Sequence, residues 1–201
     1  MDETTGLRER KKAATRLALH EAALRLAIEE GLDRVTVEAI ADAANVSRRT
    51  FSNYFSSKEE ALFHGDTMRL SRMLELIREQ PTDEQPWPAL TRAALRLTEE
   101  AFHDADPSWL TRRRQLRGHP GLAAHQVAAY ATIEREVAAE LALRLTGADV
   151  TLRSRVLAST FLTTVRVAVQ HWYEHPERPL IDTVRAALAV VAPASAGTPV
   201  A

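Results

Sequence analysis

The sequence has no cysteine, and this absence excludes disulfide bonds, thiolate zinc sites and a cysteine nucleophile. It also lacks an apolar run near the ~20 residues that a membrane-spanning helix needs. Residues 1–16 contain no hydrophobic signal-peptide core. These absences fit a reducing cytoplasm, so we expect a cytoplasmic protein with no membrane partner. Because the formal net charge is only −1, any affinity for nucleic acid must come from a local basic patch.

What is present is a hydrophobic fraction of 45% over 201 residues, enough to form a core. Alternating strand patterns are absent, and Ala, Leu, Arg and Glu dominate at helical spacing, so the predicted fold class is all-α. Pro81, Pro86 and Pro88 predict a break, because proline cannot occupy a helix interior. About nine helices are predicted, at residues 8–30, 37–43, 47–54, from 57 onward, 89–105, 107–117, 120–146, 149–175 and 177–192. Residues 1–6 and 193–201 are expected to be disordered or frayed ends.

The most informative stretch of the chain runs over residues 31–62. Thr36 and Ser47 are predicted N-caps of two short helices, Asn45 and Val46 connect them, and a capping box opens the next helix at Ser57. Isolated helices this short are marginal in water, so the long preceding helix must cover their apolar faces. Such a three-helix unit is the helix-turn-helix design, in which the second short helix enters the major groove of DNA.

The second short helix carries the residue types that this task needs. Arg48 and Arg49 follow the Ser47 cap, and an arginine that bonds guanine O6 and N7 gives ~1–3 kcal/mol of base discrimination. Thr50 and Asn53 lie at groove-facing spacing. The Tyr54 hydroxyl and the Lys58 ammonium lie further along, where they can contact phosphate oxygens. The predicted DNA-binding residues are Thr36, Ser47, Arg48, Arg49, Thr50, Asn53, Tyr54 and Lys58.

Local charge agrees with this interpretation. Residues 8–16 carry five basic residues and one acidic residue, a net charge of +4, and residues 45–58 carry a net charge of +3 with no acidic residue. The alternative is that both stretches are ordinary solvated helix faces. One of them coincides with a capped recognition helix, and this favours DNA binding.

This segment resembles the DNA-binding domain of the TetR family of bacterial regulators over residues 10–64. The resemblance implies a homodimer on a palindromic operator, a C-terminal ligand pocket and repression that a ligand relieves. Ser52 departs from the pattern, since the family often has an aromatic phosphate contact there. The matching residues are Thr36, Val37, Ile40, Ala41, Ala44, Val46, Ser47, Thr50, Phe51, Tyr54, Phe55, Ser57, Lys58 and Leu62.

The predicted domains are a helix-turn-helix DNA-binding domain at 8–64, a helical effector-binding and dimerisation domain at 65–192, and a flexible tail at 193–201. The second domain resembles regulators whose effector domain is described as acyl-CoA-like, including those of mycofactocin gene clusters. The similarity lies in an Arg-rich run before Pro120, a helix with Tyr130 and a helix ending near Trp172. Helices from Asp149 and Glu177 are the dimer candidates, through positions such as Val156, Thr160 and Val167, which can equally fill the monomer core.

A ligand would bind in an apolar cavity with a few polar groups. Aromatic side chains at helical spacing can line such a cavity or can simply fill the hydrophobic core. The arginines of residues 112–117 can bind an anionic ligand or form a solvated helix face, and the solvated face is the favoured interpretation. The predicted ligand-binding residues are Trp109, Arg113, Leu116, Tyr130, Phe161 and Trp172.

The sequence gives little support for a catalytic site or a metal site. The sequence contains no Gly-rich phosphate loop, nucleophile elbow or carboxylate pair with a defined context, so we expect neither an enzyme nor a cofactor. His171 and His175 share a helix face but have no evident third ligand, so no metal site is predicted. The predicted function is a dimeric DNA-binding repressor released by a hydrophobic or acyl-type ligand. The alternatives are a ligand-independent DNA-binding regulator and an activator.

Overall fold

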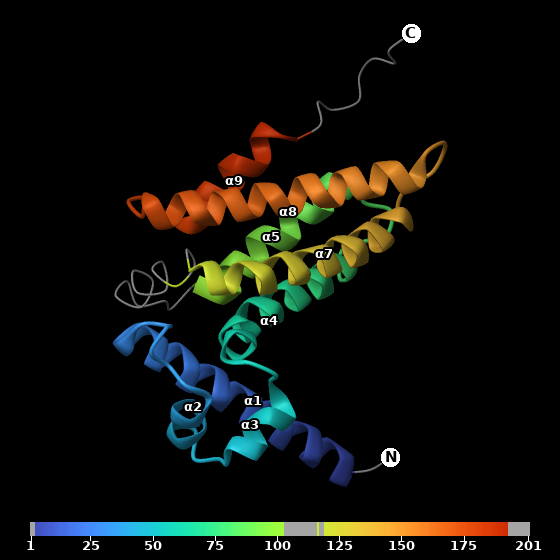
Figure 1. The fold of residues 1–201 in the computed structure, drawn as a ribbon. Helices are drawn as coiled ribbons and strands as arrows, with labels where there is room; N and C mark the ends of the chain where they lie inside the picture. The colour runs from blue at the N-terminus through green and yellow to red at the C-terminus, as the bar shows by residue number, and fades with distance from the viewer. Residues whose placement is uncertain (1–2, 103–115, 117–118, 193–201) are drawn as a thin grey trace. The chain divides into compact units, whose positions relative to one another are not determined.

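The computed structural model describes residues 3–102, 116 and 119–192, and these residues form α-helices and no strand (Figure 1). The all-α prediction is confirmed. The described helices are α1 (Glu3–Glu30), α2 (Val37–Ala43), α3 (Arg48–Tyr54), α4 (Lys58–Arg78), α5 (Pro86–Phe102), α7 (Pro120–Ala142), α8 (Val150–Glu174) and α9 (Leu180–Val190). The predicted helix at 107–117 falls almost wholly outside the described residues.

The chain divides into two compact units. The first comprises Met1–Met68 and Thr111–Val127, and the second comprises Arg69–Leu110 and Ala128–Ala201. Helices α4 and α7 therefore each run from one unit into the other. The predicted boundary at residue 64 treats the first unit as contiguous in sequence, whereas the first turns of α7 belong to it as well.

The first unit is built on the inward face of α1. This face buries Leu19, Ala23 and Leu26, while Ile40 of α2 and Phe51 of α3 are buried in the same cluster. Helices α2 and α3 have seven residues each, so their stability comes from this shared core.

Helix α1 begins earlier than the sequence indicated. The expected disordered start is wrong over residues 3–6, because the helix begins at Glu3 and includes Gly6, whereas residues 1–2 lie outside the described residues. It ends before Gly31, whose φ of +88° is a conformation that glycine adopts without strain.

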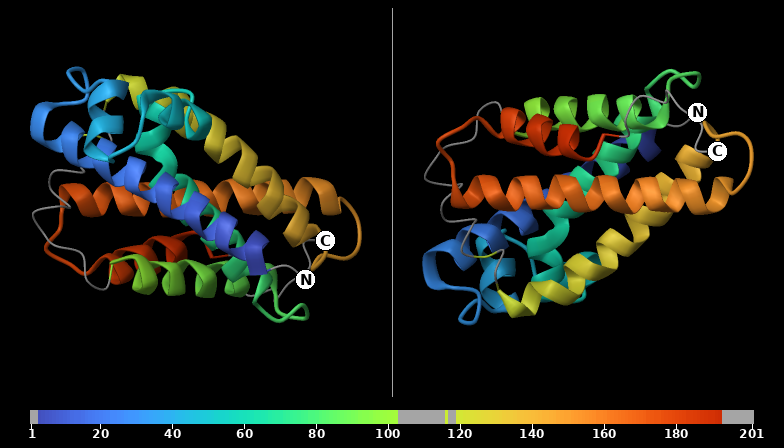
Figure 2. Two further views of the ribbon diagram at one scale, coloured as in Figure 1. Left: turned by 90° about the horizontal axis from the view of Figure 1, so that it is seen from below. Right: turned by 90° about the horizontal axis from the view of Figure 1, so that it is seen from above.

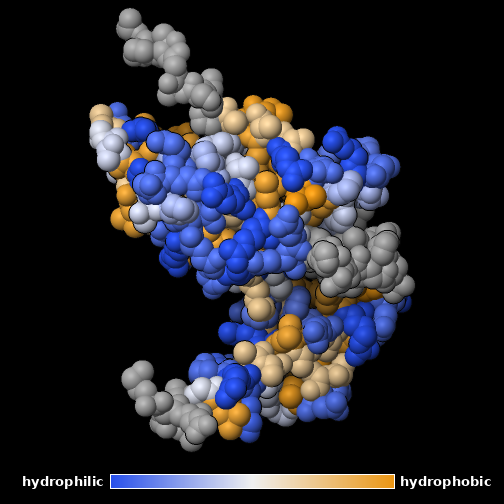
Figure 3. Space-filling view, turned by 180° about the vertical axis from the view of Figure 1, so that it is seen from behind, coloured by the Kyte–Doolittle hydropathy of each residue, from blue (hydrophilic) through white to orange (hydrophobic). Residues whose placement is uncertain are grey.

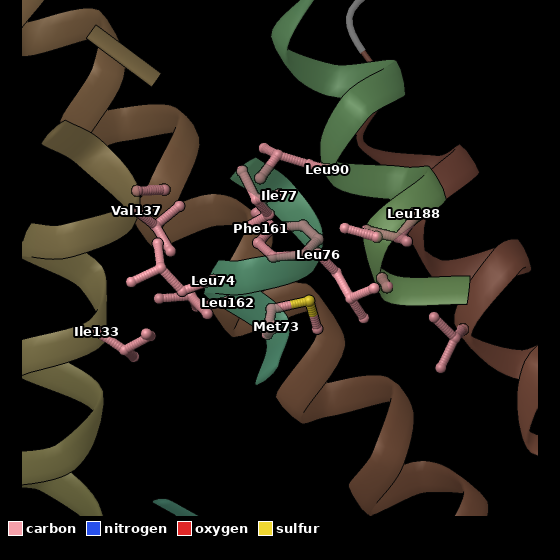
Figure 4. Close-up of a cluster of buried hydrophobic side chains, with 14 of the residues drawn as sticks. Met73, Leu74, Leu76, Ile77, Leu90, Ile133, Val137, Phe161, Leu162 and Leu188 are labelled. Atoms are coloured by element: carbon pink, nitrogen blue, oxygen red, sulfur yellow. The ribbon is translucent and has the colours of Figure 1, made fainter. Parts of the chain in front are cut away.

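The second unit has its own apolar core, to which α4, α5, α7, α8 and α9 all contribute. Figure 4 shows side chains from these helices pointing toward one another, with Phe161 of α8 close to Ile77 of α4 and Leu90 of α5. Phe161 is fully buried. Helix α9 packs against α8 and α5, as both views of Figure 2 show.

Two helix ends at the break around Pro81 and Pro86 have identifiable physical causes. Helix α5 begins at Pro86, not at residue 89, because the first turn of a helix tolerates proline. Arg144, whose side chain is almost completely buried, explains the end of α4. Its guanidinium donates to the carbonyls of Ile77 at 2.9 Å, Gln80 at 3.2 Å and Pro81, and so satisfies oxygens that the helix end leaves open.

Candidate nucleic-acid interface

The turn between α2 and α3 depends on a left-handed residue at Asn45, which has φ of +53°. Two backbone bonds close the turn: the Asn45 N–H donates to the Asp42 carbonyl at 3.0 Å, and the Val46 N–H donates to the Ala41 carbonyl at 2.9 Å. This is a Schellman ending of α2, and asparagine tolerates its left-handed position better than most residues. The turn thereby fixes the direction in which α3 leaves α2.

Ser47 caps the N-terminus of α3, as predicted. Its Oγ accepts a hydrogen bond from the Thr50 N–H at 3.0 Å and lies 2.8 Å from Thr50 Oγ1. The cap satisfies one of the backbone donors that a helix start leaves open. Because Arg48 is the first helical residue, it extends from a fixed end. A DNA contact by Ser47 or Thr50 stays a prediction.

Helix α3 presents a polar face on the side opposite its buried Phe51. Arg49, Ser52 and Asn53 are exposed on this face, and Arg49 and Asn53 are one turn apart. Within the described part of the chain, no hydrogen bond or ion pair holds the Arg49 side chain. A guanidinium and an amide at this spacing carry the donors and acceptors that base edges require.

Arg48 differs from Arg49 because it has a partner in the protein. Its guanidinium lies 3.0 Å from Glu38 Oε1 of α2, and both side chains are exposed. An exposed ion pair of this kind contributes about 0–1 kcal/mol, so a phosphate or base can replace the carboxylate at low cost.

Two residues predicted to contact DNA have partners inside the unit. Thr36 caps α2, with its Oγ1 accepting from the Ala39 N–H at 3.1 Å. Lys58 Nζ donates to the carbonyls of Leu32 and Val35, each at 2.9 Å, and so joins the start of α4 to the loop before α2. An ammonium has three donors, so one remains for a phosphate oxygen.

Arg16 of α1 reaches the C-terminal end of α3. Its guanidinium donates to the Tyr54 carbonyl at 3.2 Å and lies 5.5 Å from the centroid of the Phe55 ring. The sequence placed Arg16 only in a basic patch. Its spacing of three and four residues from the buried Leu19 and His20 was the signal that it faces inward.

His20, one turn after Arg16 on the inward face of α1, packs against α4. His20 is buried, its Nδ1 lies 2.8 Å from the Ala61 carbonyl oxygen, and its ring meets the His64 ring edge-on with 5.9 Å between centroids. The pKa of His64 lies below its ordinary value, because burial disfavours the charged ring and the Arg16 guanidinium repels it. Glu60 acts in the opposite direction and does not cancel these effects.

Glu60 closes the turn between α3 and α4. Its Oε2 accepts from the Ser56 N–H at 2.7 Å and the Ser56 hydroxyl at 2.6 Å, and its own N–H donates to Ser57 Oγ at 3.1 Å. The predicted capping box at Ser57 thus uses Ser56 as its second partner. Burial raises the pKa of Glu60, but the Ser56 hydrogen bonds and the charges of His125 and Arg16 outweigh it, and the pKa lies below its ordinary value.

The inward stripe of α1 changes from apolar to basic toward its N-terminus. Arg8, Lys11 and Lys12 continue at helical spacing the stripe that buries Leu19, and all three are exposed. Figures 1 and 2 show the first turns of α1 projecting beyond α2 and α3. An exposed row of cations therefore extends from the helix-turn-helix unit.

The predicted ligand-binding residues are divided between the units. Phe161 and Trp172 are buried in the second unit, and Tyr130 is half-buried against the same core. Leu116 is buried in the core of the first unit instead, among side chains of the helix-turn-helix. The remaining two predicted residues, Trp109 and Arg113, lie outside the described residues.

Trp87 is a buried residue of the second unit that sequence reasoning missed, because the sequence placed it between Pro86 and Pro88 in a break. Its ring meets Phe161 edge-on, with 6.5 Å between centroids. Its Nε1 is buried and has no hydrogen-bond acceptor among the residues that the structure describes. By contrast, Trp172 Nε1 donates to the Arg178 carbonyl at 2.9 Å.

Over residues 3–102, 116 and 119–192, no three His, Asp or Glu side chains are grouped to hold a metal ion. His171 and His175 are in contact, with 4.7 Å between ring centroids. In the same ranges, no helix has the length and apolar character needed to cross a membrane.

Comparison with known families gives two matches that together cover most of the chain. Residues 19–64 match the family of bacterial regulatory proteins called tetR, over the helix-turn-helix. Residues 84–196 match the MftR C-terminal domain. No curated protein matches the sequence significantly.

Solved structures of similar fold cover nearly the whole chain. Thermus thermophilus FadR, a TetR-family transcriptional repressor in complex with lauroyl-CoA, is 24% identical, with a TM-score of 0.56 over 91% of this chain and 99% of that one. NalD of Pseudomonas aeruginosa, the secondary repressor of the MexAB-OprM multidrug efflux pump, is 16% identical, with a TM-score of 0.59 over 90% and 95%. Bacillus subtilis FadR in complex with stearoyl-CoA is 20% identical, with a TM-score of 0.55 over 87% and 96%. At these identities the likeness establishes the fold alone.

Proposed function

The chain belongs to the TetR family of bacterial transcriptional regulators, and we propose that it is a homodimeric repressor of a palindromic operator that a small hydrophobic, acyl-type ligand releases. The observation that carries this proposal is helix α3. It starts at a Ser47 cap and exposes Arg49 and Asn53 on the side away from the core. A fixed short helix with an exposed polar face suits the major groove.

Arg49 and Asn53 are the residues that read base edges in this proposal. Arginine forms two hydrogen bonds to guanine, and asparagine forms two to adenine, so each distinguishes its base from the others. Arg48 exchanges Glu38 for DNA when the complex forms, since its exposed ion pair is weak.

Phosphate contacts come from the exposed cations around this helix. Arg8, Lys11 and Lys12 project from α1, and Lys58 keeps one donor for phosphate. Each neutralised phosphate makes DNA affinity more sensitive to salt, by about 0.9 in the slope of log K against log salt concentration.

A second copy of the chain is proposed to bind the outer face of α8 and α9. Leu152, Val156 and Val167 of α8 are 63%, 55% and 50% exposed at helical spacing, and Val190 of α9 is 83% exposed. Figure 3, which views the molecule from the side opposite to Figure 1, shows that small apolar patches also reach the surface there among hydrophilic side chains. Two copies related by a twofold axis would bury this face as a four-helix bundle, and the two recognition helices would then meet half-sites ~34–36 Å apart.

The effector is proposed to bind in the second unit beside Trp87 and Phe161. Their surroundings are apolar, and the buried Trp87 Nε1–H offers one donor to a polar atom of a ligand. The match to the MftR C-terminal domain and the acyl-CoA bound in two of the similar structures support an acyl-type ligand. A ligand that favours a wider spacing of the recognition helices lowers operator affinity by that preference.

The test begins with selection of duplexes by the full-length protein from a random DNA pool. We expect a palindromic consensus, two protomers on each duplex by native mass spectrometry, and release on addition of lauroyl-CoA but not of coenzyme A alone. A protein that enriches no sequence contradicts the DNA-binding proposal. Enrichment without release by any acyl-CoA chain length contradicts the effector proposal only.

A further inference from the structure

We propose that Arg16 is a positioning residue for DNA recognition, which holds the C-terminal end of α3 from α1 and does not itself bind phosphate. This inference rests on the proposed DNA-binding function. The charge of Arg16 suggests the same role as the other cations of residues 8–16, but the inference gives it a different one.

The C-terminal end of α3 has open carbonyls that Arg16 can satisfy. The last carbonyls of a helix have no partner within the helix, and a cation there complements the helix dipole. Helix α3 has no basic residue in its own last turn. Arg16 supplies this charge from another helix, because its guanidinium donates to the carbonyl of Tyr54, the last residue of α3.

The surroundings of Arg16 hold its side chain inside the first unit. The residue is half-buried, its guanidinium lies over the Phe55 ring, and its Nε is buried without an acceptor among the described residues. The Arg16 charge interacts electrostatically with two titratable groups of α4, Glu60 and His64. Binding a phosphate would require Arg16 to leave both the Tyr54 carbonyl and the Phe55 ring.

Helix α3 is fixed at several points along its length. The turn at Asn45 holds its N-terminal end, and Phe51 of its middle and the C-cap residue Phe55 are buried in the core. At the C-terminal end, Arg16 adds a long-range hydrogen bond that fixes the backbone at the Tyr54 carbonyl. Without it, the tilt of α3 is less restricted, and Arg49 and Asn53 lose the geometry that two-point base contacts require. Contacts with phosphate tolerate such tilting, since they carry no sequence information.

Lys12 is the matched control for Arg16. It lies on the same helix one turn earlier, carries the same charge and is exposed. Removing Lys12 therefore removes a phosphate contact and leaves α3 in place. Removing Arg16 leaves the phosphate contacts and loosens α3.

The experiment compares Arg16→Gln with Lys12→Gln on the duplex that the wild-type protein selects and on an unrelated duplex, over a series of salt concentrations. Arg16→Gln is expected to lose about tenfold in affinity for the selected duplex and less than about twofold for the unrelated one, with an unchanged salt slope. Lys12→Gln is expected to weaken both equally and to reduce the salt slope by about 1 per protomer.

Two further measurements separate positioning from a loss of folding. In Arg16→Gln, NMR titration of the His64 ring should give a higher pKa than in the wild type, because the repelling charge is gone. Arg16→Lys keeps a cation near the end of α3 and should discriminate between the duplexes better than Arg16→Gln. An Arg16→Gln protein that lowers the salt slope as Lys12→Gln does, or that keeps wild-type discrimination, overturns the inference. A wild-type protein that selects no duplex overturns the proposed function and this inference together.

Discussion

The ring of His20 lies directly against Gly65, so that a Cβ added at Gly65 would lie 2.5 Å from His20 Nε2 and 2.9 Å from its Cε1. The opposite side of the same ring is held by the Ala61 carbonyl, 2.8 Å from Nδ1. Helices α1 and α4 are therefore fixed against each other by a buried ring that fits only where α4 lacks a side chain. His20, Ala61 and Gly65 all belong to the first unit, so this contact stabilises that unit.

Replacing Gly65 by alanine is predicted to destabilise the protein by about 1–3 kcal/mol, because the added methyl group must displace the His20 ring. In a helix without this neighbour the same change stabilises by about 1 kcal/mol. Urea denaturation of the wild type and Gly65→Ala measures the difference.

A matched double variant decides the cause. In a His20→Ala background the ring is absent, so Gly65→Ala should become neutral or stabilising. If Gly65→Ala costs the same free energy of unfolding in both backgrounds, the His20 contact is not the reason for the glycine.

The left-handed turn gives a second prediction. Asn45→Ala should lower the free energy of unfolding by about 1 kcal/mol. An alanine at positive φ has the same steric strain as asparagine but lacks the polar side chain that can hydrogen-bond locally. Asn45→Gly should be close to neutral, because glycine adopts this conformation freely. Thermal denaturation of both variants checks the order, and an alanine variant as stable as the glycine variant would argue against a left-handed residue 45.

The local parts of this molecule were predictable from sequence because their causes are local. Thr36 and Ser47 cap helices through bonds to residues three positions ahead, and such bonds leave a signature in adjacent residues. The bounds of α2 and α3 followed from these caps. The exposure of Arg49 and Asn53 followed from helical spacing around Phe51.

The contacts that sequence reasoning did not foresee join residues that are distant in the sequence. Arg16 and Tyr54 are 38 positions apart, and Lys58 meets carbonyls 23 and 26 positions earlier. Charge patterning assigns such side chains to solvent or DNA, since nothing nearby in the sequence marks their partners. Leu116 likewise joined the first unit's core, although its place in the sequence suggested the effector domain.

The depressed pKa of His64 predicts a dependence of stability on pH. As pH falls below the ordinary histidine value of about 6.5, the unfolded ring takes up a proton while the folded ring stays neutral. The free energy of unfolding should therefore fall with pH until the folded pKa is reached, and this contribution should then level off.

His64→Gln removes this titration and is the comparison to make by urea denaturation between pH 7 and pH 5. From pH 7 to pH 5, the free energy of unfolding of the wild type should fall relative to that of His64→Gln. A difference that is constant across the window contradicts a depressed His64 pKa. Glu60 adds a separate loss below its ordinary value of 4.5, since its pKa is also depressed.

The outer face of α8 gives a prediction on assembly. Val156→Glu places a charge on the surface that a second copy is proposed to cover, so it should shift the protein from dimer to monomer in analytical ultracentrifugation. Leu143→Glu is the control, because Leu143 is 80% exposed beyond the end of α7 and off this face. Two variants of equal dimer affinity would place the interface elsewhere.

The measurement that tests the account most directly is the affinity of Arg49→Ala for the duplex that the wild-type protein selects, against that of Arg25→Ala, which removes an exposed arginine from α1. Arg49→Ala is predicted to lose ~1–3 kcal/mol of binding free energy for each half-site and to tolerate any base at the guanine it contacted, while Arg25→Ala binds like the wild type. If Arg49→Ala binds the selected duplex with wild-type affinity and base preference, α3 is not the element that reads DNA.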